Sequence, residues 1–420
     1  MSSAIPPPVV VIGAGIVGVC TAATLQRDGR DVVLIDPGEP GMGASFGNGA
    51  CLFPSSIVPM SMPGTARNVP RYLLNPEGPL SIRMRYLPRL APWLLRFARA
   101  GTAERAEAAA RALRALLRDV QDGYAPLVKE AGAEDLLHRR GYLIVYESEA
   151  AFQADAGGNA LRERNGIAVE EVAAARIREM EPKLAPIYAR GRLIREAGHT
   201  SNPHRLVQRL CEMLVRKGGR IVREALTGFE DNGGVVTAVR TGAGRHPARA
   251  VVLAAGAWSK PLAAQLGDSV PLDTERGYHA MIARPECAPT LPVMSGEGKF
   301  IAITLETGIR FAGQVELASL DARPNWNRAR ILLRQGMRMF PGLGENGLLE
   351  RQSLWMGHRP SMPDSLPVIG PSSRFPNAIY AFGHGHVGMC AAPTTARIVT
   401  DLLAGRQPPV DIAPFSPRRF

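Results

Sequence analysis

The sequence predicts an α/β fold of more than one domain, and three observations support this prediction. Residues 9–37 read VVVIGAGIVGVCTAATLQRDGRDVVLIDP, a pattern typical of a strand, a glycine-rich turn, a helix and a second strand that ends in an acid. A chain of 420 residues that is 45% hydrophobic can bury a large core and exceeds one ordinary domain. The last part, with a strand at Ala378–Phe382 and a helix around 391–404, looks like a further piece of the same nucleotide domain, which we therefore expect to be discontinuous.

The first glycine-rich turn predicts a dinucleotide site. Gly13, Gly15 and Gly18 form G-x-G-x-x-G, and Asp36 follows Gly18 by eighteen residues. The first glycine allows a tight turn, the second removes a Cβ that would block a pyrophosphate, and the third lets helix and strand pack closely. The helix N-terminus offers N–H groups to the phosphates, and Asp36 can accept hydrogen bonds from a ribose. Such runs also occur as plain turns, but the flanking strands and the spaced acid favour the dinucleotide.

Composition excludes several classes of protein. No apolar run approaches the roughly 20 residues that a membrane span needs, and no cationic stretch precedes the apolar one at the N-terminus. The five cysteines are odd in number, scattered and free of any C-x-x-C pair, which favours reduced thiols over disulfides or a metal site. We therefore expect a cytoplasmic protein that binds no metal.

Basic charge is concentrated in one stretch of the chain. The net charge is +12, and between residues 81 and 118 nine arginines accompany only two acids, Glu104 and Glu107. Leucines, Trp93 and Phe97 lie among these arginines, so the stretch could lie on an anionic membrane, at the inner face. The alternative is an ordinary helix with its apolar side in the core and its arginines in water. No recognised nucleic-acid module accompanies the charge, so we expect no nucleic-acid partner.

The rest of the chain contains no repeat and divides into recognisable segments. Residues 38–54 are too rich in Gly and Pro for regular structure, and proline-punctuated sequence continues to Trp93. Helical patterning follows to about residue 131. A helix is expected over 202–218, with Asn202 as its cap and Pro203 as its first residue. The remaining expected elements are strands at 141–147, 220–229, 235–240 and 250–255, and a strand-rich region over 271–354 that a helix near Asn327–Met339 interrupts.

Three further segments indicate close approach of the backbone to a ligand. They are residues 43–49 (GASFGNG), 251–259 (VVLAAGAWS) and 383–389 (GHGHVGM), the last directly before a helix. Small residues at a helix start suit a flat ring that gains negative charge, as a reduced flavin does. Each segment alone is more often a loop. Together with the first turn, they favour FAD over NAD.

These segments resemble, in matching order over nearly the whole chain, the family of D-amino acid oxidase, glycine oxidase and bacterial D-amino acid dehydrogenase. VIGAGIVGVCTAATL and VVLIDP resemble the first FAD motif, GMGASFGNGA the second, and AVVLAAGAWS the strand that closes the adenine side. GHRPSMPDSLPVIG and YAFGHGHVGMCAAPTTARIVTDLL resemble the C-terminal signature. The likeness is greatest to the dehydrogenase branch, in SFGNGA and GHGHVGM.

The resemblance implies a Rossmann-type FAD-binding domain, discontinuous in sequence, and a substrate domain built on an antiparallel sheet over the flavin. The expected FAD-binding domain comprises residues 1–85, 200–270 and 355–420, and the substrate domain 86–199 and 271–354. Some relatives attach the flavin through a His after the first motif or a Cys before the last. Asn48 and Gly49 occupy the first neighbourhood here, Cys287 lies well upstream of the last motif and Cys390 beyond it. We therefore expect non-covalent FAD.

Motif and resemblance together nominate a set of residues that contact FAD. They are Gly13, Gly15, Ile16, Val17, Gly18, Asp36, Pro37, Gly43, Ala44, Ser45, Asn48, Gly49, Leu226, Ala255, Gly256, Trp258, Gly385, His386, Val387, Gly388 and Met389. A His in a glycine-rich loop, as His384 and His386 are, is more often supporting or exposed than catalytic.

Arg359, in the G-x-R-P motif, is the leading candidate for substrate binding. Its guanidinium fork can hold a carboxylate by two parallel charge-assisted hydrogen bonds, and in the resembled family this Arg is the carboxylate clamp. An arbitrary Arg is more often a solvated surface residue. Arg276 and Tyr278 are expected to assist the carboxylate, with sheet packing of Tyr278 as an equal alternative.

The implied reaction is oxidation of a D-amino acid, or of a D-imino acid such as a proline derivative, with hydride passing from Cα to flavin. The imine is hydrolysed to a 2-oxo acid or released as a cyclic imine, and a quinone or another acceptor takes the electrons. No base is required if the amine binds unprotonated, and loops around 60–79 and 293–311 set the side chain accepted. One alternative is a glycine- or sarcosine-type oxidase that uses oxygen. Another, disfavoured by the G-x-R-P motif and by the lack of a methyltransferase domain, is an RNA-modifying flavoprotein.

Overall fold

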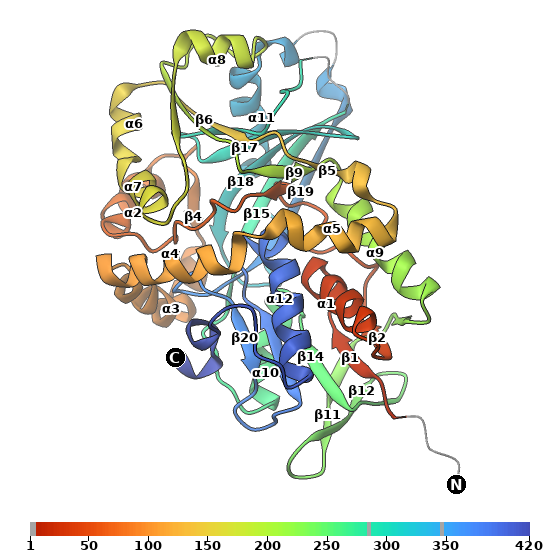
Figure 1. Cartoon of the computed structure of the whole chain (residues 1–420). Helices are drawn as coiled ribbons and strands as arrows, with labels where there is room; N and C mark the ends of the chain where they lie inside the picture. Colours follow the sequence, from red (N-terminus) through yellow and green to blue (C-terminus); the bar gives the residue numbers. More distant parts are fainter. Residues whose placement is uncertain (1–5, 284–286, 345–347) are drawn as a thin grey trace.

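The computed structural model describes residues 6–283, 287–344 and 348–420 (Figure 1). Residues 1–5, part of the N-terminal segment examined for a targeting signal, lie outside the described residues. Two large sheets dominate the described part of the chain, one in the lower half of Figure 1 and one in the upper half. Helices cover both of them.

The lower sheet is the parallel sheet that the first motif predicts. Its central strand β1 (Val9–Ile12) is buried on both faces, as expected of a hydrophobic strand in a parallel sheet, and pairs with β2 on one side and β14 on the other. Only β20 runs antiparallel, at one edge. Its strands, in spatial order, are β10 (Arg220–Val222), β2 (Val32–Ile35), β1, β14 (Ala250–Leu253), β21 (Ala378–Phe382) and β20 (Val368–Pro371).

Helices from distant parts of the chain cover one face of this sheet. Helix α1 (Ile16–Arg27) packs along α12 (Gly388–Leu403) and against α9 (Pro203–Arg216). The contact between α1 and α12 brings segments near the two ends of the chain together. Helices α4 (Ala103–Leu117) and α5 (Val120–Ala131) also pack on α12 and share its core. Part of the expected substrate segment 86–199 thus lies against the nucleotide-binding half.

The upper sheet is mainly antiparallel. Its longest strands, β15 (Asp273–Ile282), β18 (Gly308–Leu317) and β19 (Gln352–Ser361), lie side by side, and α11 (Asn327–Met339) packs on one face of them. The other strands of this sheet are β17 (Phe300–Leu305), β16 (Val293–Ser295), β6 (Tyr142–Tyr146), β8 (Arg190–Ile194), β7 (Glu170–Ala173) and β4 (Leu80–Ile82). The face opposite α11 is turned toward the nucleotide-binding half.

Smaller elements complete the described fold. A three-stranded ribbon of β11 (Leu226–Asp231), β12 (Val236–Thr241) and β13 (Arg245–Pro247) lies beside the parallel sheet, and β3 (Cys51–Leu52), β9 (Gly198–Thr200) and β5 (Leu137–His138) form a second small sheet. The remaining helices are α2 (Thr65–Leu74), α3 (Leu87–Ala100), α6 (Glu149–Ala154), α7 (Ala156–Arg164), α8 (Ala174–Met180) and α10 (Ser259–Gln265).

Most of the expected elements are confirmed. Helix α9 begins at Pro203, and the side chain of its cap Asn202 accepts the N–H of Arg205. Helix α11 and strand β21 occupy the expected residues, and β6 lies within 141–147. The closing helix begins at Gly388, three residues before the expected start.

Three expectations are wrong in detail. Residues 38–54, expected to lack regular structure, contain the short strand β3, because Cys51 and Leu52 pair with β9. Residues 220–229 form parts of two strands, β10 and β11, that belong to different sheets. The proline-punctuated stretch before Trp93 contains α2 and the start of α3, with Pro70 and Pro92 inside the helices. In α3, burial of Leu90 and Trp93 stabilises a helix that Pro92 weakens. Tertiary packing therefore outweighs the low helix propensity of proline.

The basic stretch over 81–118 has buried and exposed apolar side chains, and membrane contact by this stretch stays a prediction. Helix α3 buries Leu90 and Trp93, whereas Met84 and Leu95 are 73% and 62% exposed among exposed arginines. None of the described helices combines the length and the hydrophobicity that a membrane span requires.

Candidate cofactor and substrate site

The glycine-rich turn connects β1 to α1 at the carboxyl end of the parallel sheet. A Cβ on Gly13, which has φ +104°, would lie 2.4 Å from the Ala254 carbonyl oxygen, and one on Gly18 would lie 1.9 Å from the Gly13 oxygen. Both positions therefore require glycine. A Cβ on Gly15 would meet only Ser45 Oγ, at 3.4 Å, so the backbone beside Gly15 can be approached closely. Helix α1 has neither a side-chain cap nor an acid in its first turn, which leaves its N-terminus suited to a phosphate.

Asp36, at the end of the neighbouring strand β2, fixes the glycine-rich turn by hydrogen bonds. It follows β2 directly, and its two carboxylate oxygens accept the N–H of Ala14 at 2.8 Å and that of Gly38 at 2.7 Å. These bonds fix the carboxylate at the edge of the sheet where parallel strands bind nucleotides. Pro37 follows it in the chain, at the expected place.

The second glycine-rich segment, 43–49, packs against the first turn. Ser45 Oγ accepts the N–H of Ile16 at 2.9 Å, and the Asn48 amide donates to the Ser45 carbonyl. A buried guanidinium on β18, that of Arg310, donates to the carbonyls of Phe46 and Asn48 at 3.0 and 2.8 Å. Arg310 therefore connects the substrate sheet to this loop. Burial lowers the pKa of Arg310 to about 10.

The C-terminal segment 383–389 meets the same region. The N–H of Gly385 donates to the Pro360 carbonyl at 2.7 Å, and α12 begins at Gly388 without a side-chain cap. Val17 on α1 lies 4.0 Å from the place where a Cβ on Gly388 would sit. The structure thus brings the expected cofactor residues of the first, second and last motifs together.

The residues expected on the adenine side occupy a second cluster. Leu226, the first residue of β11, and Ala255 pack against the core beside β14. Gly256 and Trp258 follow in a short 3-10 helix, and Trp258 is half exposed with its ring edge-on to His358, 5.5 Å between centroids. Trp258 therefore lies at the junction between the two halves of the molecule.

Arg359 lies on the face of β19 that looks toward the cofactor motifs. In the pairing of β15 with β19, Glu275 is opposite Arg359, Gly277 opposite Gly357 and His279 opposite Trp355, and these six share one face. His279 Nδ1 donates to the Gly47 carbonyl at 3.0 Å and its ring stacks on Trp355, which fixes that face against segment 43–49.

The Arg359 guanidinium lies over Gly277 and rests on backbone oxygens. A Cβ at Gly277 would be 2.5 Å from Arg359 Cζ, so only glycine leaves room for this placement. The guanidinium donates to the carbonyls of Gln314 at 2.8 Å and Gly313 at 3.2 Å. Both carbonyls are turned toward it by a bulge in β18, where Gln314 has φ +59°. Burial lowers the pKa of Arg359 and the nearby Glu275 raises it, and the group stays charged.

Arg276 and Tyr278 lie on the other face of β15. Arg276 is fully buried and pairs with Glu316 at 3.2 Å, and the Tyr278 hydroxyl donates to the same carboxylate at 2.5 Å. Tyr278 also packs in the core under α11. The expectation that they assist Arg359 does not fit this placement, because the two-residue period of the strand points them away from it. The alternative role of Tyr278, sheet packing, fits.

A narrow recess lies where the Arg359 face meets the C-terminal segment. Glu275, Ser361, His384, Gly385 and His386 line it, together with apolar residues such as Met60 and Leu113. His386 is open to this recess, yet the surrounding protein and the charge of Arg359 lower its pKa to about 4. Buried His384 lies 3.1 Å from Thr395 Oγ1, and burial lowers its pKa to about 3. Both histidines are therefore neutral at pH 7.

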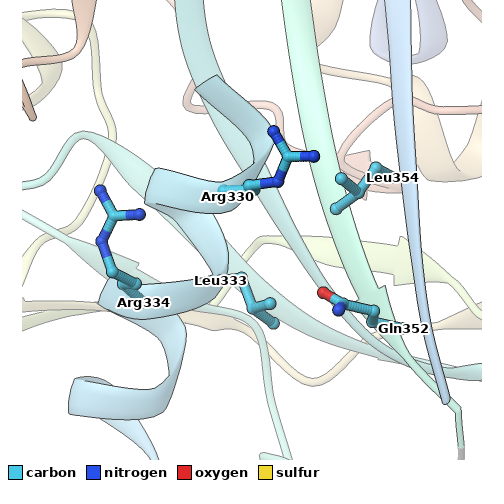
Figure 2. A pocket seen from close by; sticks show the side chains of 5 residues that line it. All are labelled: Arg330, Leu333, Arg334, Gln352 and Leu354. Atoms are coloured by element: carbon cyan, nitrogen blue, oxygen red, sulfur yellow. The ribbon is translucent and has the colours of Figure 1, made fainter. Parts of the chain in front are cut away.

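A larger groove lies on the opposite face of the substrate sheet. Helix α11 and strand β19 form its walls, and Figure 2 shows the Arg330 side chain reaching from the helix toward the strand. Arg330, Leu333, Arg334, Gln352 and Leu354 line it. This groove contains no residue of the expected cofactor or substrate set, so we place the candidate site at the recess.

Two buried charged residues of this region were not predicted from the sequence. Arg310 and Glu275 both carry a charge in strands that are otherwise largely apolar, GIRFAGQVEL and DTERGYHAMI, and that contrast was the available signal. Among the residues that the structure describes, no group of three or more His, Cys, Asp or Glu could hold a metal ion.

The parallel sheet, the glycine-rich turn between β1 and α1 and the start of α12 are typical of a dinucleotide-dependent enzyme. Residues 8–402 match the DAO family, described as FAD dependent oxidoreductase, and the chain belongs to this family. The expected family, fold class, FAD cofactor and oxidoreductase activity are thereby confirmed, and the residues described above fit FAD.

Known relatives span nearly the full length of the chain. A D-amino-acid oxidase of Bradyrhizobium diazoefficiens is 44% identical over 415 residues, 98% of each protein, and a D-amino acid dehydrogenase of Granulibacter bethesdensis is 29% identical over 98% of this chain and 99% of that protein. Among solved structures, glycine oxidase from Geobacillus kaustophilus has a TM-score of 0.73 at 21% identity, covering 98% of both chains. L-proline dehydrogenase from P. horikoshii has a TM-score of 0.74 at 18% identity, covering 99% of this chain and 98% of that one. These two similarities establish the fold.

Proposed function

We propose that this enzyme oxidises D-amino acids, or a D-imino acid such as a proline derivative, by removing hydride from Cα. The observation that carries the proposal is Arg359, held over Gly277 on the sheet face that meets the cofactor motifs. A guanidinium fork in that position suits the carboxylate of an amino acid. The relatives named D-amino-acid oxidase and D-amino acid dehydrogenase support the D configuration.

The chain's residues would bind and orient the substrate, whereas bound FAD supplies the two-electron acceptor. Arg359 holds the carboxylate in two directions at once, which fixes Cα relative to the sheet. This orientation converts the hydride step into an effectively intramolecular one. His384 and His386 are neutral beside the site, so they add no second positive charge that would compete with Arg359 for the carboxylate.

We propose that FAD binds without a covalent bond along the three glycine-rich segments. The pyrophosphate would lie at Gly15 and the N-terminus of α1, a ribose at Asp36, and the adenine side near Leu226, Ala255 and Trp258. The flavin ring would lie between segments 43–49 and 383–389. Denaturation of the holoenzyme followed by filtration tests the absence of a covalent link, because all flavin should then pass the filter.

Anaerobic mixing of the purified holoenzyme with a panel of D- and L-amino acids tests the main proposal. D-amino acids should bleach the flavin absorbance, and their L enantiomers should not. If no amino acid bleaches it, the enzyme oxidises something else.

The electron acceptor separates this proposal from its closest alternative. We propose a quinone or a similar acceptor, and the oxygen-using alternative of glycine or sarcosine type is supported by the relative named an oxidase. The reduced enzyme should be reoxidised slowly by air and quickly by a soluble quinone. Fast peroxide release in air would favour the oxidase instead.

We propose a cytoplasmic enzyme whose surface over residues 84–100, the short 3-10 helix Met84–Tyr86 and α3, contacts the inner face of the membrane. Exposed Met84 and Leu95 alternate there with exposed Arg85, Arg89 and Arg96, which suits an anionic lipid surface. Co-sedimentation with vesicles containing anionic lipid should exceed that with neutral vesicles and should decline with salt. Tight RNA binding that falls steeply with salt would instead support an RNA-modifying flavoprotein.

A further inference from the structure

The recess beside Arg359 contains a buried carboxylate that the proposed function leaves without a role. Building on that function, we propose that Glu275 binds the α-ammonium group of the substrate and takes one proton from it. The amine is then neutral when hydride leaves Cα. Glu275 would act as the base of the reaction.

Position is the first argument for this role. Glu275 lies directly opposite Arg359 in the β15–β19 pair, on the same face, and is 7% exposed at the wall of the recess. Directly opposed residues on one face of a sheet have Cβ atoms only about 5 Å apart. An amino acid carries its carboxylate and its ammonium on one carbon. A site that holds the carboxylate with Arg359 therefore brings the ammonium close to Glu275.

Charge is the second argument. The Arg359 guanidinium donates to the carbonyls of Gln314 and Gly313, so its hydrogen bonds are made to uncharged partners and Glu275 does not occupy its fork. A carboxylate substrate without a cation would place two negative charges beside one positive charge in a buried site. A zwitterionic amino acid keeps the positive and negative charges in the site equal, because its ammonium group accompanies its carboxylate. Proton transfer from ammonium to Glu275 then leaves a single ion pair, between Arg359 and the substrate carboxylate.

The neighbouring titratable groups leave Glu275 as the base. The charged or titratable groups around it are Arg359 on β19, His384 and His386 on the C-terminal segment, and Asp273 on its own strand. Asp273 accepts a hydrogen bond from Tyr86, His384 lies against Thr395, and the charge of Arg359 opposes protonation of His386. Burial raises the pKa of Glu275, while Arg359 and Ser361 lower it and Asp273 raises it further. A carboxylate with a raised pKa is a stronger base than an ordinary one.

The proton and electron balance is complete. One N–H bond of the ammonium breaks and its proton passes to a Glu275 oxygen, which frees the nitrogen lone pair. The Cα–H bond breaks with its electron pair, the hydrogen leaves as hydride to the isoalloxazine, and the lone pair forms the C=N bond. The protonated imine is hydrolysed to a 2-oxo acid and ammonium. The proton on Glu275 then passes to water, which restores the carboxylate.

The pH dependence of kcat/KM for a D-amino acid tests the proposal. With Glu275 as base, wild-type kcat/KM should stay level from the pKa of Glu275 to the pKa of the substrate amine. In Glu275→Gln only the free amine reacts, so kcat/KM should rise about tenfold per pH unit up to the amine pKa. Near pH 7 the variant should be roughly 10²–10⁴-fold slower, and above the amine pKa the difference should shrink.

Glu316→Gln is the matched control. It removes a buried carboxylate from the same sheet on the opposite face, and should lower stability without changing the shape of the pH profile. The flavin spectrum of each variant checks that it folds and binds FAD. A wild-type profile that itself rises to the amine pKa, or a Glu275→Gln profile that matches wild type, overturns the role of Glu275. Failure of wild type to react with any amino acid would instead reject the proposed function.

Discussion

The two faces of the sheet formed by β15, β18 and β19 carry similar groups but differ in how their charges are paired. On the α11 face, the guanidinium of Arg276 is fully buried and bound to Glu316, which also accepts the hydroxyl of Tyr278. On the cofactor face, the hydrogen bonds that Arg359 donates within the described part of the chain go to main-chain carbonyls, and Gly277 leaves space beneath it. A buried Arg that the protein has already paired with a carboxylate stabilises the fold. One that the protein has left with neutral partners can receive a charged ligand.

The largest effect expected on the α11 face is a loss of stability from Arg276→Met. It removes the buried one of the two cations that pair with Glu316, although Arg83 still bridges the other oxygen at 2.9 Å. Breaking such a pair costs about 3–5 kcal/mol, and we expect the lower end of this range. Denaturant unfolding of the holoenzyme measures it. The remaining folded enzyme should keep its KM, and a raised KM would place Arg276 in the substrate site after all.

The largest effect expected on the cofactor face is a loss of activity from Arg359→Ala. Removing one partner of a buried charge pair costs about 2–5 kcal/mol, which lowers kcat/KM by roughly 30- to several-thousand-fold. Arg330→Ala, in the groove beside α11, is the matched control and should have wild-type kinetics. Unchanged kinetics in Arg359→Ala would mean that Arg359, like Arg276, does not bind the substrate.

Gly277→Ala should reduce activity while the charge of Arg359 is kept. The added methyl group displaces the guanidinium, and a misplacement near 1 Å costs roughly a hundredfold in rate. Steady-state kinetics with a D-amino acid would show this loss. Gly157→Ala is the control, because a Cβ there would meet open space. Equal activity of the two variants would mean that the position of Arg359 over Gly277 is unimportant.

Tyr278→Phe should give the smallest effect. It removes one hydrogen bond to Glu316 and one from the N–H of Asn325, so the free energy of unfolding should fall by about 1–2 kcal/mol. Its kcat/KM should be that of wild type. A fall in kcat/KM without a change in stability would show that the α11 face takes part in substrate binding.

The cofactor half could be predicted from sequence because its constraints are local. Gly13, Gly15 and Gly18 act within one turn, and Asp36 follows at a spacing that one helix and one strand impose. The substrate half depends on pairing between distant strands. Arg310 reaches Phe46 across 264 positions of sequence, and no local pattern encodes that contact.

The prediction that Arg276 and Tyr278 assist Arg359 in binding the carboxylate does not fit the structure, for a different reason. The alternation in DTERGYHAMI places Arg276 and Tyr278 on one face and Glu275 and Gly277 on the other, and this period was available in the sequence. Which face meets the cofactor follows only from the packing of α11. The stability of α3 despite Pro92 was hidden in the same way, because it comes from packing of Leu90 and Trp93.

The bulge at Gln314 affects how a substrate carboxylate binds to Arg359. Its two carbonyl oxygens do for the Arg359 guanidinium what hydrating water does at the surface, yet they are fixed in place by the sheet. An arriving carboxylate thus meets a cation that was largely dehydrated when the protein folded. It displaces little ordered solvent and exchanges weak dipolar contacts for charged ones.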